Sequence, residues 1–417
     1  MARPERLSVL WGDEVVGTIH DTARLAFAYS PAWLAREDRF PVAAIPLMPG
    51  LQDAEVVQAF FENLLPEGEL RDYLAQQKKA STLFSMLLEV AGDTAGAFVI
   101  VPEGETPKPP TYQATSWQAL GAALSKPSAA AVDLKGARAR ISLAGAQDKT
   151  SLAIFDDGVP RLPRGVAPST HILKPDIKRL AKVWQSAANE TIVMRVAAEC
   201  GLPAAEVFYE PMTRACVVRR FDRYQRPDGT LGRLVQYDLC QLAGTVSDRK
   251  YEKEGGPGIA ACAALIRQRS IQPAVDLRHF LNWIFFNLYV GNNDSHAKNL
   301  SLYVLPGQGV RLTPFYDLMC TRLYAGLSGE FAFSIGGENR PGEIARQHVV
   351  AMAETLGMQP RFVLGQAAEL AQRIPGAVAR AVEHTLPSLP HGARDLADRL
   401  GRFIQSTTRK VSARIVA

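Results

Sequence analysis

The pattern of apolar positions divides the chain into a first part rich in strands and a second part rich in helices. Leu7–Trp11 and Val15–His20 alternate between apolar and polar residues around the turn pair Gly12-Asp13, which predicts a β-hairpin. Further strands are predicted at 97–101, 141–143, 150–155, 170–174, 207–209 and 215–221. Helices are predicted between them at 54–63, 82–90 and 185–200.

Beyond Gln236, apolar residues recur three and four positions apart, which is helical spacing. Helices are predicted at 259–267, 277–290, 348–356, 360–373 and 393–409. Residues 102–110 are rich in Pro and charge and lack large apolar residues, so they are typical of a linker. These patterns predict an α+β fold with a β-rich first part and an α-rich second part, which together make a bilobal protein.

The segment Asn292–Asn299 is a dense polar cluster between the apolar run 280–290 and the strand-like run 300–305. Asp294 and Asn299 are separated by four residues, the spacing at which a catalytic loop holds a general base and an amide ligand of Mg²⁺. Asp317 follows a short predicted strand and adds a second carboxylate. A base, an amide ligand and a carboxylate in this order indicate phosphoryl transfer from ATP with Mg²⁺.

His296 in this loop has two interpretations. It could join Asp294 and Asp317 in a transition-metal site. A lone histidine in a loop more often forms hydrogen bonds with the backbone and orders the loop, and we favour that interpretation. His171, in a predicted strand, is interpreted as a structural histidine.

The segment Ile141–Thr150 consists largely of small residues and lies between two predicted strands. Small residues allow backbone N–H groups to approach a phosphate closely. The segment resembles a Walker A loop because Gly145 precedes the pair Lys149-Thr150, but Asp148 stands where the second glycine belongs and a strand follows. The segment therefore predicts either a phosphate loop or a tight β-hairpin.

Lys174 ends a predicted buried strand, where it could contact the ATP phosphates or leave the sheet for solvent. Glu190, on the next predicted helix, could pair with Lys174 or lie on a solvated face. In Arg219–Arg223, the backbone groups of Arg219 and Phe221 could bind an adenine edge at a hinge. The alternative is a surface strand with ordinary salt bridges, and the sequence does not decide between them.

The composition is that of an ordinary globular protein. The chain has 417 residues, enough for two domains or lobes, with 47% hydrophobic residues, 21% charged residues and a net charge of +5. This mild charge gives no argument for nucleic-acid binding. The 5 cysteines are far apart and form no C-x-x-C pair, so they are interpreted as buried thiols in a reducing compartment.

The start of the chain lacks the apolar core of a signal peptide, and no apolar run reaches the roughly 18 residues of a membrane span. We therefore expect a cytoplasmic protein that does not contact a membrane.

Several motifs, in this order along the chain, resemble the HipA-like serine/threonine kinase toxins of bacterial type II toxin–antitoxin modules. The motifs are Tyr29–Leu34, Phe60–Pro66, Ser142–Thr150, Arg220–Arg223, Tyr251-Glu252 with Gly255–Gly258, Asp294–Asn299 and Leu312–Asp317. The resemblance covers nearly the full length and implies a bilobal kinase-like fold. The implied parts are an extra N-terminal α/β subdomain at 1–106, a β-rich kinase N-lobe at 107–238 and an all-helical C-terminal lobe at 239–417.

The resemblance also implies roles for individual residues. Asp294 would be the catalytic base, and Asn299 and Asp317 would be the Mg²⁺ ligands. Ser142 would be an autophosphorylated serine whose modification expels the phosphate loop and silences the kinase, because about two added negative charges repel the nucleotide phosphates. The residues implied for ATP binding are Ala144, Gly145, Ala146, Gln147, Asp148, Lys149, Lys174, Arg219, Arg220, Phe221, His296, Ala297, Lys298, Asn299 and Tyr316.

The chain departs from the family pattern at a few positions. Asn293 precedes the proposed base where a small residue or Thr is common, and Ser295 follows it where Gly is common. Compared with protein kinases in general, the G-x-G-x-x-G loop is missing, and Leu318 and Met319 replace the Phe-Gly after the metal-binding aspartate. None of these changes removes a group that the chemistry requires.

By this resemblance, the protein would inhibit growth by phosphorylating a translation component such as an aminoacyl-tRNA synthetase. Its partners would be a small antitoxin resembling HipB and, mainly through that antitoxin, operator DNA. Two alternatives stay open: a non-catalytic co-repressor that stabilises the antitoxin on DNA, and a small-molecule kinase of the aminoglycoside type. The presence of Asp294, Asn299, Asp317 and Lys174 argues against the first, and the N-terminal subdomain argues against the second.

Overall fold

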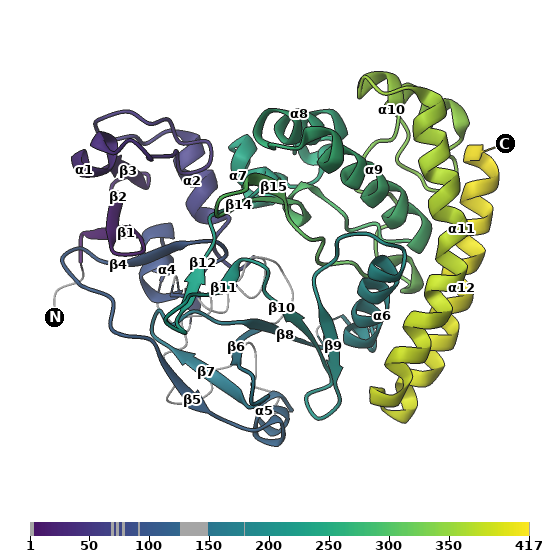
Figure 1. Cartoon of the computed structure of the whole chain (residues 1–417), viewed down its shortest axis with the longest axis horizontal. Helices are drawn as coiled ribbons and strands as arrows, with labels where there is room; N and C mark the ends of the chain where they lie inside the picture. Colours follow the sequence, from purple (N-terminus) through teal and green to yellow (C-terminus); the bar gives the residue numbers. More distant parts are fainter. Residues whose placement is uncertain are drawn as a thin grey trace. The chain divides into compact units, whose positions relative to one another are not determined.

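The chain folds into two compact units, and Figure 1 labels its helices and strands. The computed structural model describes residues 4–67, 71, 75–76, 80–90, 92–125, 149–178 and 180–416. Unit 1 comprises residues 1–173 and 220–248, and unit 2 comprises residues 174–219 and 249–417. The chain passes between them after Leu173, Arg219 and Asp248.

Unit 1 begins with an antiparallel sheet of strand order β3-β2-β1-β4. Its strands are β1 (Arg6–Trp11), β2 (Glu14–His20), β3 (Ala26–Tyr29) and β4 (Phe98–Pro102). The predicted hairpin is therefore confirmed as β1 and β2. The helices of this region are α1 (Pro31–Ala35), α2 (Glu55–Glu62) and α4 (Leu83–Val90). Phe60 of α2 packs edge-on against Phe98 of β4 at 6.0 Å, which joins the helix to the sheet in one core.

The remainder of unit 1 contains a second group of antiparallel strands, paired β5–β7, β7–β6 and β6–β8. The elements are β5 (Thr111–Ala114), α5 (Trp117–Leu124), β6 (Thr150–Ile154), β7 (Pro160–Arg164), β8 (His171–Pro175), β11 (Arg223–Gln225), β12 (Leu231–Arg233), β13 (Gln236–Asp238) and α7 (Leu239–Ala243). Strands β11 and β12 form a hairpin, and Asp238 and Gln241 form a capping box that begins α7. The last two residues of β8, Lys174 and Pro175, belong to unit 2.

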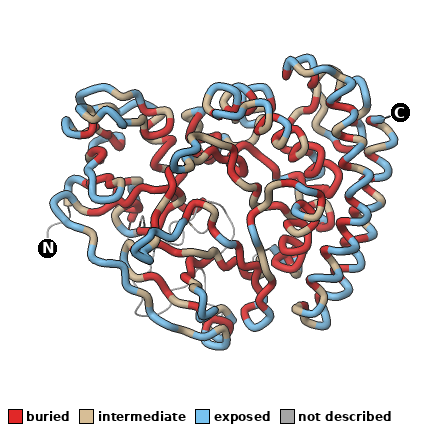
Figure 2. The backbone as a smooth tube through the Cα atoms, in the orientation of Figure 1, coloured by how far each residue is buried: buried red, intermediate tan, exposed pale blue. Residues whose placement is uncertain are grey.

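Unit 2 is mainly helical. Its helices are α6 (Ser186–Glu199), α8 (Ile259–Arg269), α9 (Pro273–Val290), α10 (Arg346–Thr355), α11 (Pro360–Thr385) and α12 (His391–Val416), with short 3₁₀ turns η2 (Glu252–Glu254), η3 (Ala297–Asn299), η4 (Thr321–Leu323) and η5 (Leu386–Ser388). The long helices α11 and α12 lie side by side (Figure 1). Each buries one face and exposes the other (Figure 2).

Unit 2 also contains strands. β9 (Val207–Glu210) pairs antiparallel with β10 (Ala215–Arg219), and β14 (Ser301–Leu305) pairs antiparallel with β15 (Gly309–Leu312). The C-terminal region is thus mainly, but not entirely, helical. Together the two units confirm the predicted α+β fold class.

Several predicted element ends were wrong; α12, for example, continues to Val416, although the prediction ended it at Arg409. Helix α11 continues to Thr385, although the prediction ended it at Arg373, before Pro375. A proline inside a helix removes one backbone hydrogen bond, but the buried face continues through Ile374, Ala377 and Val378, and this packing keeps the helix intact. Strand β10 ends at Arg219, two residues earlier than predicted. The predicted strand 141–143 lies outside the described residues.

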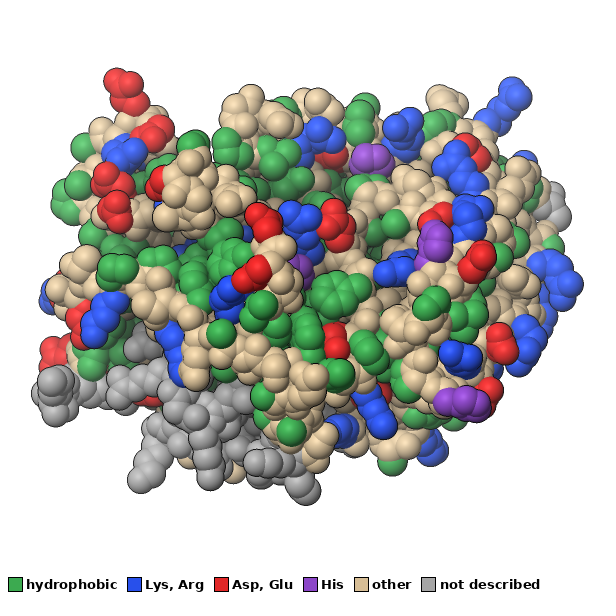
Figure 3. Space-filling view, turned by 60° about the horizontal axis from the view of Figure 1, so that its bottom comes forward, with side chains coloured by type: hydrophobic (Ala, Val, Ile, Leu, Met, Phe, Trp, Pro, Cys, Tyr) green, Lys and Arg blue, Asp and Glu red, His purple; other side chains and the backbone are tan. Residues whose placement is uncertain are grey.

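The surface and the cysteines add little that is unusual. On the face drawn in Figure 3, Lys and Arg side chains are interspersed with Asp and Glu side chains. All 5 cysteines are buried free thiols. Burial raises the pKa of Cys200 and Cys320 to about 12, so these thiols are unreactive at neutral pH. Among the described helices, none has the length and apolar character needed to cross a membrane.

Candidate active site

The polar loop after α9 starts from a tightly fixed helix end. Gly291 caps α9 in the left-handed conformation at φ 76°, which favours glycine. The Asn292 backbone N–H donates to the Asn287 carbonyl at 2.9 Å, and the Asn292 amide donates to Asn287 Oδ1 at 2.8 Å. This pair of asparagines turns the chain out of the buried helix in one defined direction.

Asp294 is the only residue between Trp283 and Leu302 that is not buried. Its backbone N–H donates to Asn292 Oδ1 at 3.2 Å. Its carbonyl accepts the His296 backbone N–H at 3.1 Å and the Asn299 side-chain amide at 2.9 Å. The loop backbone is therefore fixed from inside, while the carboxylate is presented at the surface. An exposed acid on a buried, ordered loop is suited to accept a proton from an external group.

Asn299 and Asp294, predicted together from their spacing, are in direct contact. Since the Asn299 amide nitrogen donates to Asp294, its Oδ1 is left as the acceptor atom of this buried side chain. A neutral amide oxygen is one of the hard ligands that Mg²⁺ accepts.

Lys174, Glu190 and Asp317 form a second group. Lys174 Nζ lies 2.6 Å from Glu190 Oε1 and also contacts Asp317 Oδ1. Side-chain exposure is 6% for Lys174 and 2% for Glu190, so the solvent-facing alternatives for both residues were wrong. Burial alone would lower the pKa of Lys174, but the carboxylates of Asp317 and Glu190 outweigh burial and raise it, so the side chain is a permanent cation.

Asp317 has a backbone conformation that side chains rarely adopt, with φ at 58°. Such a conformation costs on the order of 1–3 kcal/mol and is concentrated at functional sites. Its side chain is 34% exposed although it is paired with the buried Lys174. The carboxylate thus joins a buried cation on one side and solvent on the other.

The donor set at this site fits Mg²⁺ better than a transition metal. Asn299 and Asp317 offer oxygen atoms, and Mg²⁺ is commonly held by one or two protein oxygens plus phosphate and water. Among the described residues there is no group of three or more His, Cys, Asp or Glu side chains that could hold a metal ion. Asp294, His296 and Asp317 therefore do not form the alternative transition-metal site.

His296 is buried, and its ring lies edge-on against Tyr251 at 5.0 Å. Burial, with the positive charge of Lys250, lowers the pKa of His296 well below its ordinary value, although Asp317 opposes this effect. The ring is neutral at physiological pH, and its Nδ1 has no hydrogen-bond partner among the described residues. His296 orders the loop through its backbone, whose carbonyl accepts from the Asn299 N–H at 2.9 Å.

Tyr316 joins the two predicted groups of site residues. Its hydroxyl donates to the Lys298 carbonyl at 2.9 Å and lies 2.7 Å from Ser301 Oγ. The residue before Asp317 is thereby fixed to the 3₁₀ turn that carries Asn299, and Ala297 and Lys298 of that turn are buried.

The predicted hinge residues have mixed surroundings. Arg219 ends β10 in unit 2, where its exposed side chain pairs with Glu206 at 2.9 Å. Phe221 is half-buried in unit 1. Arg220, also in unit 1, is fully committed to a buried cluster of charges, which we call the Arg–Asp cluster. Its members are Asp93, Arg220, Asp222, Arg223 and Arg233.

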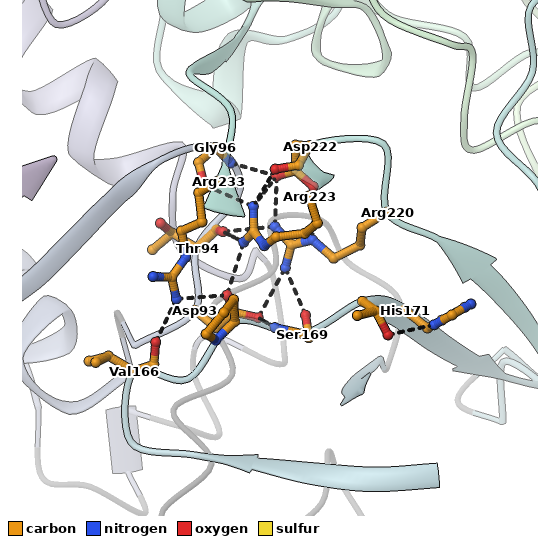
Figure 4. A network of polar contacts seen from close by, with 12 residues as sticks. Asp93, Thr94, Gly96, Val166, Ser169, His171, Arg220, Asp222, Arg223 and Arg233 are labelled. Carbon is orange, nitrogen blue, oxygen red and sulfur yellow. Dashed lines mark hydrogen bonds and ion pairs between the residues drawn. The ribbon is translucent and has the colours of Figure 1, made fainter. Parts of the chain in front are cut away.

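In the Arg–Asp cluster, three arginines converge on two aspartates (Figure 4). Asp93 contacts Arg220 at 3.1 Å, Arg223 at 2.9 Å and Arg233 at 3.3 Å. Asp222 contacts Arg220 and Arg223, each at 2.8 Å. Burial would raise the pKa of Asp222, but Arg220 and Arg223 outweigh it and hold the pKa at about 2. The side chains of Arg220, Asp222 and Arg223 are therefore internal supports of unit 1.

Other predicted residues are placed as follows. Lys149 is buried and directly precedes β6. His171 Nδ1 lies 2.8 Å from Thr170 Oγ1, as expected for a structural histidine. Ser142, Ala144, Gly145, Ala146, Gln147 and Asp148 lie outside the described residues.

Two residues that hold these groups in place, Asp93 in the Arg–Asp cluster and Tyr251 beside Asp294, were not predicted from the sequence. Asp93 follows the end of α4 and had no assigned role, and its arginine partners lie 127–140 positions away. Tyr251, whose hydroxyl donates to Asp294 Oδ1, was noted only as part of a motif. The signal for Tyr251 was its position before the unusual run Gly255-Gly256-Pro257-Gly258.

Comparison with known proteins decides the family. The profile of the HipA-like C-terminal domain matches residues 141–382, and that of the HipA N-terminal domain matches residues 7–101. The chain belongs to the HipA-like family of serine/threonine kinase toxins. The C-terminal match includes every residue that the sequence suggested for the base, the metal ligands and ATP.

Individual relatives agree with this assignment. Y4mE of Sinorhizobium fredii, named as a candidate kinase, is 35% identical over 398 residues, which is 91% of this chain and 92% of the relative. The serine/threonine-protein kinase toxin HipA of Shewanella oneidensis is 28% identical over 399 residues, covering 91% and 90% of the two chains. The solved complex of Shewanella oneidensis HipA, HipB and operator DNA matches with a TM-score of 0.82 at 26% identity, covering 99% of each chain.

Proposed function

We propose that this HipA-like protein is an ATP- and Mg²⁺-dependent serine/threonine protein kinase whose general base is Asp294. The observation that carries the proposal is the loop geometry. The exposed carboxylate of Asp294 stands on a buried loop, and the backbone carbonyl of Asp294 accepts a hydrogen bond from the side-chain amide of Asn299. This is the base-and-ligand pair that phosphoryl transfer to a hydroxyl needs.

In the proposed reaction, the acceptor hydroxyl donates its proton to the Asp294 carboxylate as its oxygen attacks the γ-phosphorus of ATP. The bond from that phosphorus to the bridging oxygen breaks, and ADP leaves. Asn299 and Asp317 would hold Mg²⁺, which would neutralise the negative charge of the phosphates. Lys174 is kept charged and in place by Glu190 and Asp317, so it can bind a phosphate as a fixed cation.

The remaining nucleotide contacts are also part of the proposal. Ala144–Lys149 would form the phosphate loop, and the backbone of Arg219–Phe221 would bind the adenine edge. His296–Asn299 and Tyr316 would line the nucleotide beside the base, consistent with the hydrogen bond of Tyr316 to the Lys298 carbonyl. The three-part division at 106 and 238 also stays a prediction.

We further propose that the kinase is the toxin of a toxin–antitoxin module in the cytoplasm. Its substrate would be a translation component such as an aminoacyl-tRNA synthetase. A small antitoxin resembling HipB would bind it and connect it to operator DNA. The match to a HipA that was solved with HipB and operator DNA supports the antitoxin and the DNA as partners. Autophosphorylation of Ser142 would provide a second means of inhibition.

Growth and labelling with an Asp294→Gln variant test the proposal. Expressed without antitoxin, the wild type and an Asp398→Asn control, altered at an exposed acid on α12, should stop growth. Asp294→Gln should not stop growth, and it should fail to transfer ³²P from ATP to a lysate protein. Equal toxicity of Asp294→Gln would contradict the kinase-toxin assignment. Label found only in small molecules would favour a small-molecule kinase.

Incubation of the purified protein with ATP, followed by intact-mass and peptide analysis, tests the autoinhibition separately. The proposal expects one phosphate on Ser142, which a Ser142→Ala variant does not acquire. Active kinase without phosphate on Ser142 would contradict this part of the proposal.

A further inference from the structure

The exposed position of Asp294 raises a question about its side chain. The contacts with Asn292, His296 and Asn299 described above fix its backbone. A carboxylate at the surface keeps rotamer freedom unless its own oxygens are bound, and a base must meet the acceptor proton within hydrogen-bond reach. A contact to a carboxylate oxygen of Asp294 would therefore determine how the base is oriented toward the acceptor hydroxyl.

Tyr251 supplies such a contact. Its hydroxyl donates to Asp294 Oδ1 from a segment 43 positions earlier in the chain. The Tyr251 ring is held on two sides: the His296 ring lies edge-on at 5.0 Å with an interplanar angle of 87°, and Lys250 Nζ lies over the ring at 5.6 Å. The direction of the phenol O–H is therefore set by packing as well as by its acceptor.

The turn that carries Tyr251 is folded tightly. The backbone carbonyl of Tyr251 accepts the Gly256 N–H at 2.9 Å. A Cβ on Gly256 would lie 2.3 Å from the Arg249 carbonyl oxygen, so glycine is needed there, and a Cβ on Gly258 would lie 2.5 Å from Glu252 Oε1 and displace that carboxylate. Glu252 Oε2 also accepts the Ser334 N–H at 2.6 Å, which anchors the turn to a separate segment of unit 2.

We infer that Tyr251 is a positioning residue for the base. It holds one carboxylate oxygen of Asp294, so the carboxylate faces the incoming hydroxyl in a single orientation. Tyr251 keeps its own proton throughout the reaction, and the acceptor's proton goes to Asp294. The inference rests on the proposed role of Asp294 and assigns a function to the Tyr251-Glu252 and glycine motif, which otherwise has none.

The variant Tyr251→Phe removes only the hydroxyl and keeps the ring against His296. A hydrogen bond to a charged group contributes about 1.5–3 kcal/mol, so we expect kcat for phosphoryl transfer to fall about 10- to 100-fold. The Kd for ATP and the Tm should match the wild type, because the variant keeps the ring packed against His296 and loses only the hydroxyl that donates to Asp294. Tyr224→Phe, which alters an exposed tyrosine of unit 1, should leave all three unchanged.

A double-mutant cycle with Asp294→Asn separates positioning from a general structural effect. If Tyr251 acts through Asp294, Tyr251→Phe causes no further loss of rate in the Asp294→Asn background. An equal loss in both backgrounds, a wild-type kcat for Tyr251→Phe, or a raised kcat would each overturn the inference. A raised kcat would mean that the phenol competes with the acceptor.

The same cycle distinguishes failure of this inference from failure of the proposed function. If Asp294→Asn keeps wild-type activity, the assignment of the base is wrong, and the role of Tyr251 is overturned with it. If Asp294→Asn loses activity while Tyr251→Phe keeps it, only the role of Tyr251 is overturned.

Discussion

The Arg–Asp cluster of unit 1 and the loop Asn292–Asn299 of unit 2 are both polar regions set in buried surroundings, but their charged groups are placed differently. In the cluster, each of the five charged side chains has an opposite charge within 3.3 Å. In the loop, the charged side chain of Asp294 is exposed to solvent. A polar group whose charges are all paired internally supports the fold, whereas a carboxylate left facing solvent can do chemistry.

The energetics follow from this difference. A buried charge costs several kcal/mol unless an opposite charge accompanies it, so removing one partner of a buried pair is strongly destabilising. An exposed carboxylate carries little of that cost. Changes in the cluster should therefore act on stability, and changes in the loop should act on rate.

The largest effect is expected for Asp294→Asn. Since a general base contributes about 10²- to 10⁴-fold, kcat for phosphoryl transfer should fall by about that factor. The Tm should change little, because the side chain is exposed. Initial rates with [γ-³²P]ATP and a thermal melt measure the two quantities, with Asp398→Asn as the matched control. A loss under about tenfold would place the base elsewhere.

Asp93→Asn should have the opposite signature. It removes one charge and leaves Arg220, Arg223 and Arg233 with Asp222 as the remaining aspartate of the cluster. The free energy of unfolding should fall by about 3–5 kcal/mol, as for other broken buried pairs. Urea unfolding measures it, and Asp13→Asn, altered at an exposed acid in the β1–β2 turn, serves as the control. A loss under about 1 kcal/mol would show that the cluster does not support the fold.

A change at Lys174 should affect nucleotide binding. Lys174→Met removes a buried cation fixed by Glu190 and Asp317. If Lys174 binds a phosphate, the Kd for ATP should rise about 10- to 100-fold, the equivalent of one charged hydrogen bond. Calorimetric titration with ATP and Mg²⁺ measures this, and the exposed Lys178→Met is the control. An unchanged Kd would remove Lys174 from the nucleotide site.

The smallest effect is a pH dependence in the cluster. Asp222 has a folded-state pKa of about 2, below its ordinary value of 3.8. A lowered pKa contributes stability that is present above the unfolded pKa and is lost as pH falls through the folded one. Asp222→Asn should therefore be about 2 kcal/mol closer to the wild type in unfolding free energy at pH 2 than at pH 7. A difference that does not change with pH would contradict the ionised pairing.

What could be predicted from the sequence follows the range of the contacts. Asp294 and Asn299 lie five positions apart, so their spacing alone was enough to predict them as the base and the amide ligand of one site; the structure adds that they are in contact. The fold class and most helices followed from apolar periodicity, which is also local. The pairing of Lys174 with Asp317 spans 143 positions, and nothing in the sequence predicted it.

The parts that were not predicted depend on tertiary contacts. Nothing near Asp93 in the sequence identifies its arginine partners, and nothing near Tyr251 shows that its hydroxyl reaches Asp294. The predicted end of α11 was wrong for a related reason. Proline is unfavourable inside an isolated helix, but packing of the buried residues around Pro375 overrides that preference.

The most direct test of the central claim is a crossed comparison of Asp294→Asn and Asp93→Asn, in which the phosphoryl-transfer rate is measured per folded molecule well below both melting temperatures. The account predicts that Asp294→Asn retains the wild-type Tm and loses at least about 100-fold in rate. Asp93→Asn should melt at a lower temperature and keep a rate within a few-fold of the wild type. An Asp294→Asn protein that transfers phosphate at the wild-type rate would contradict the account.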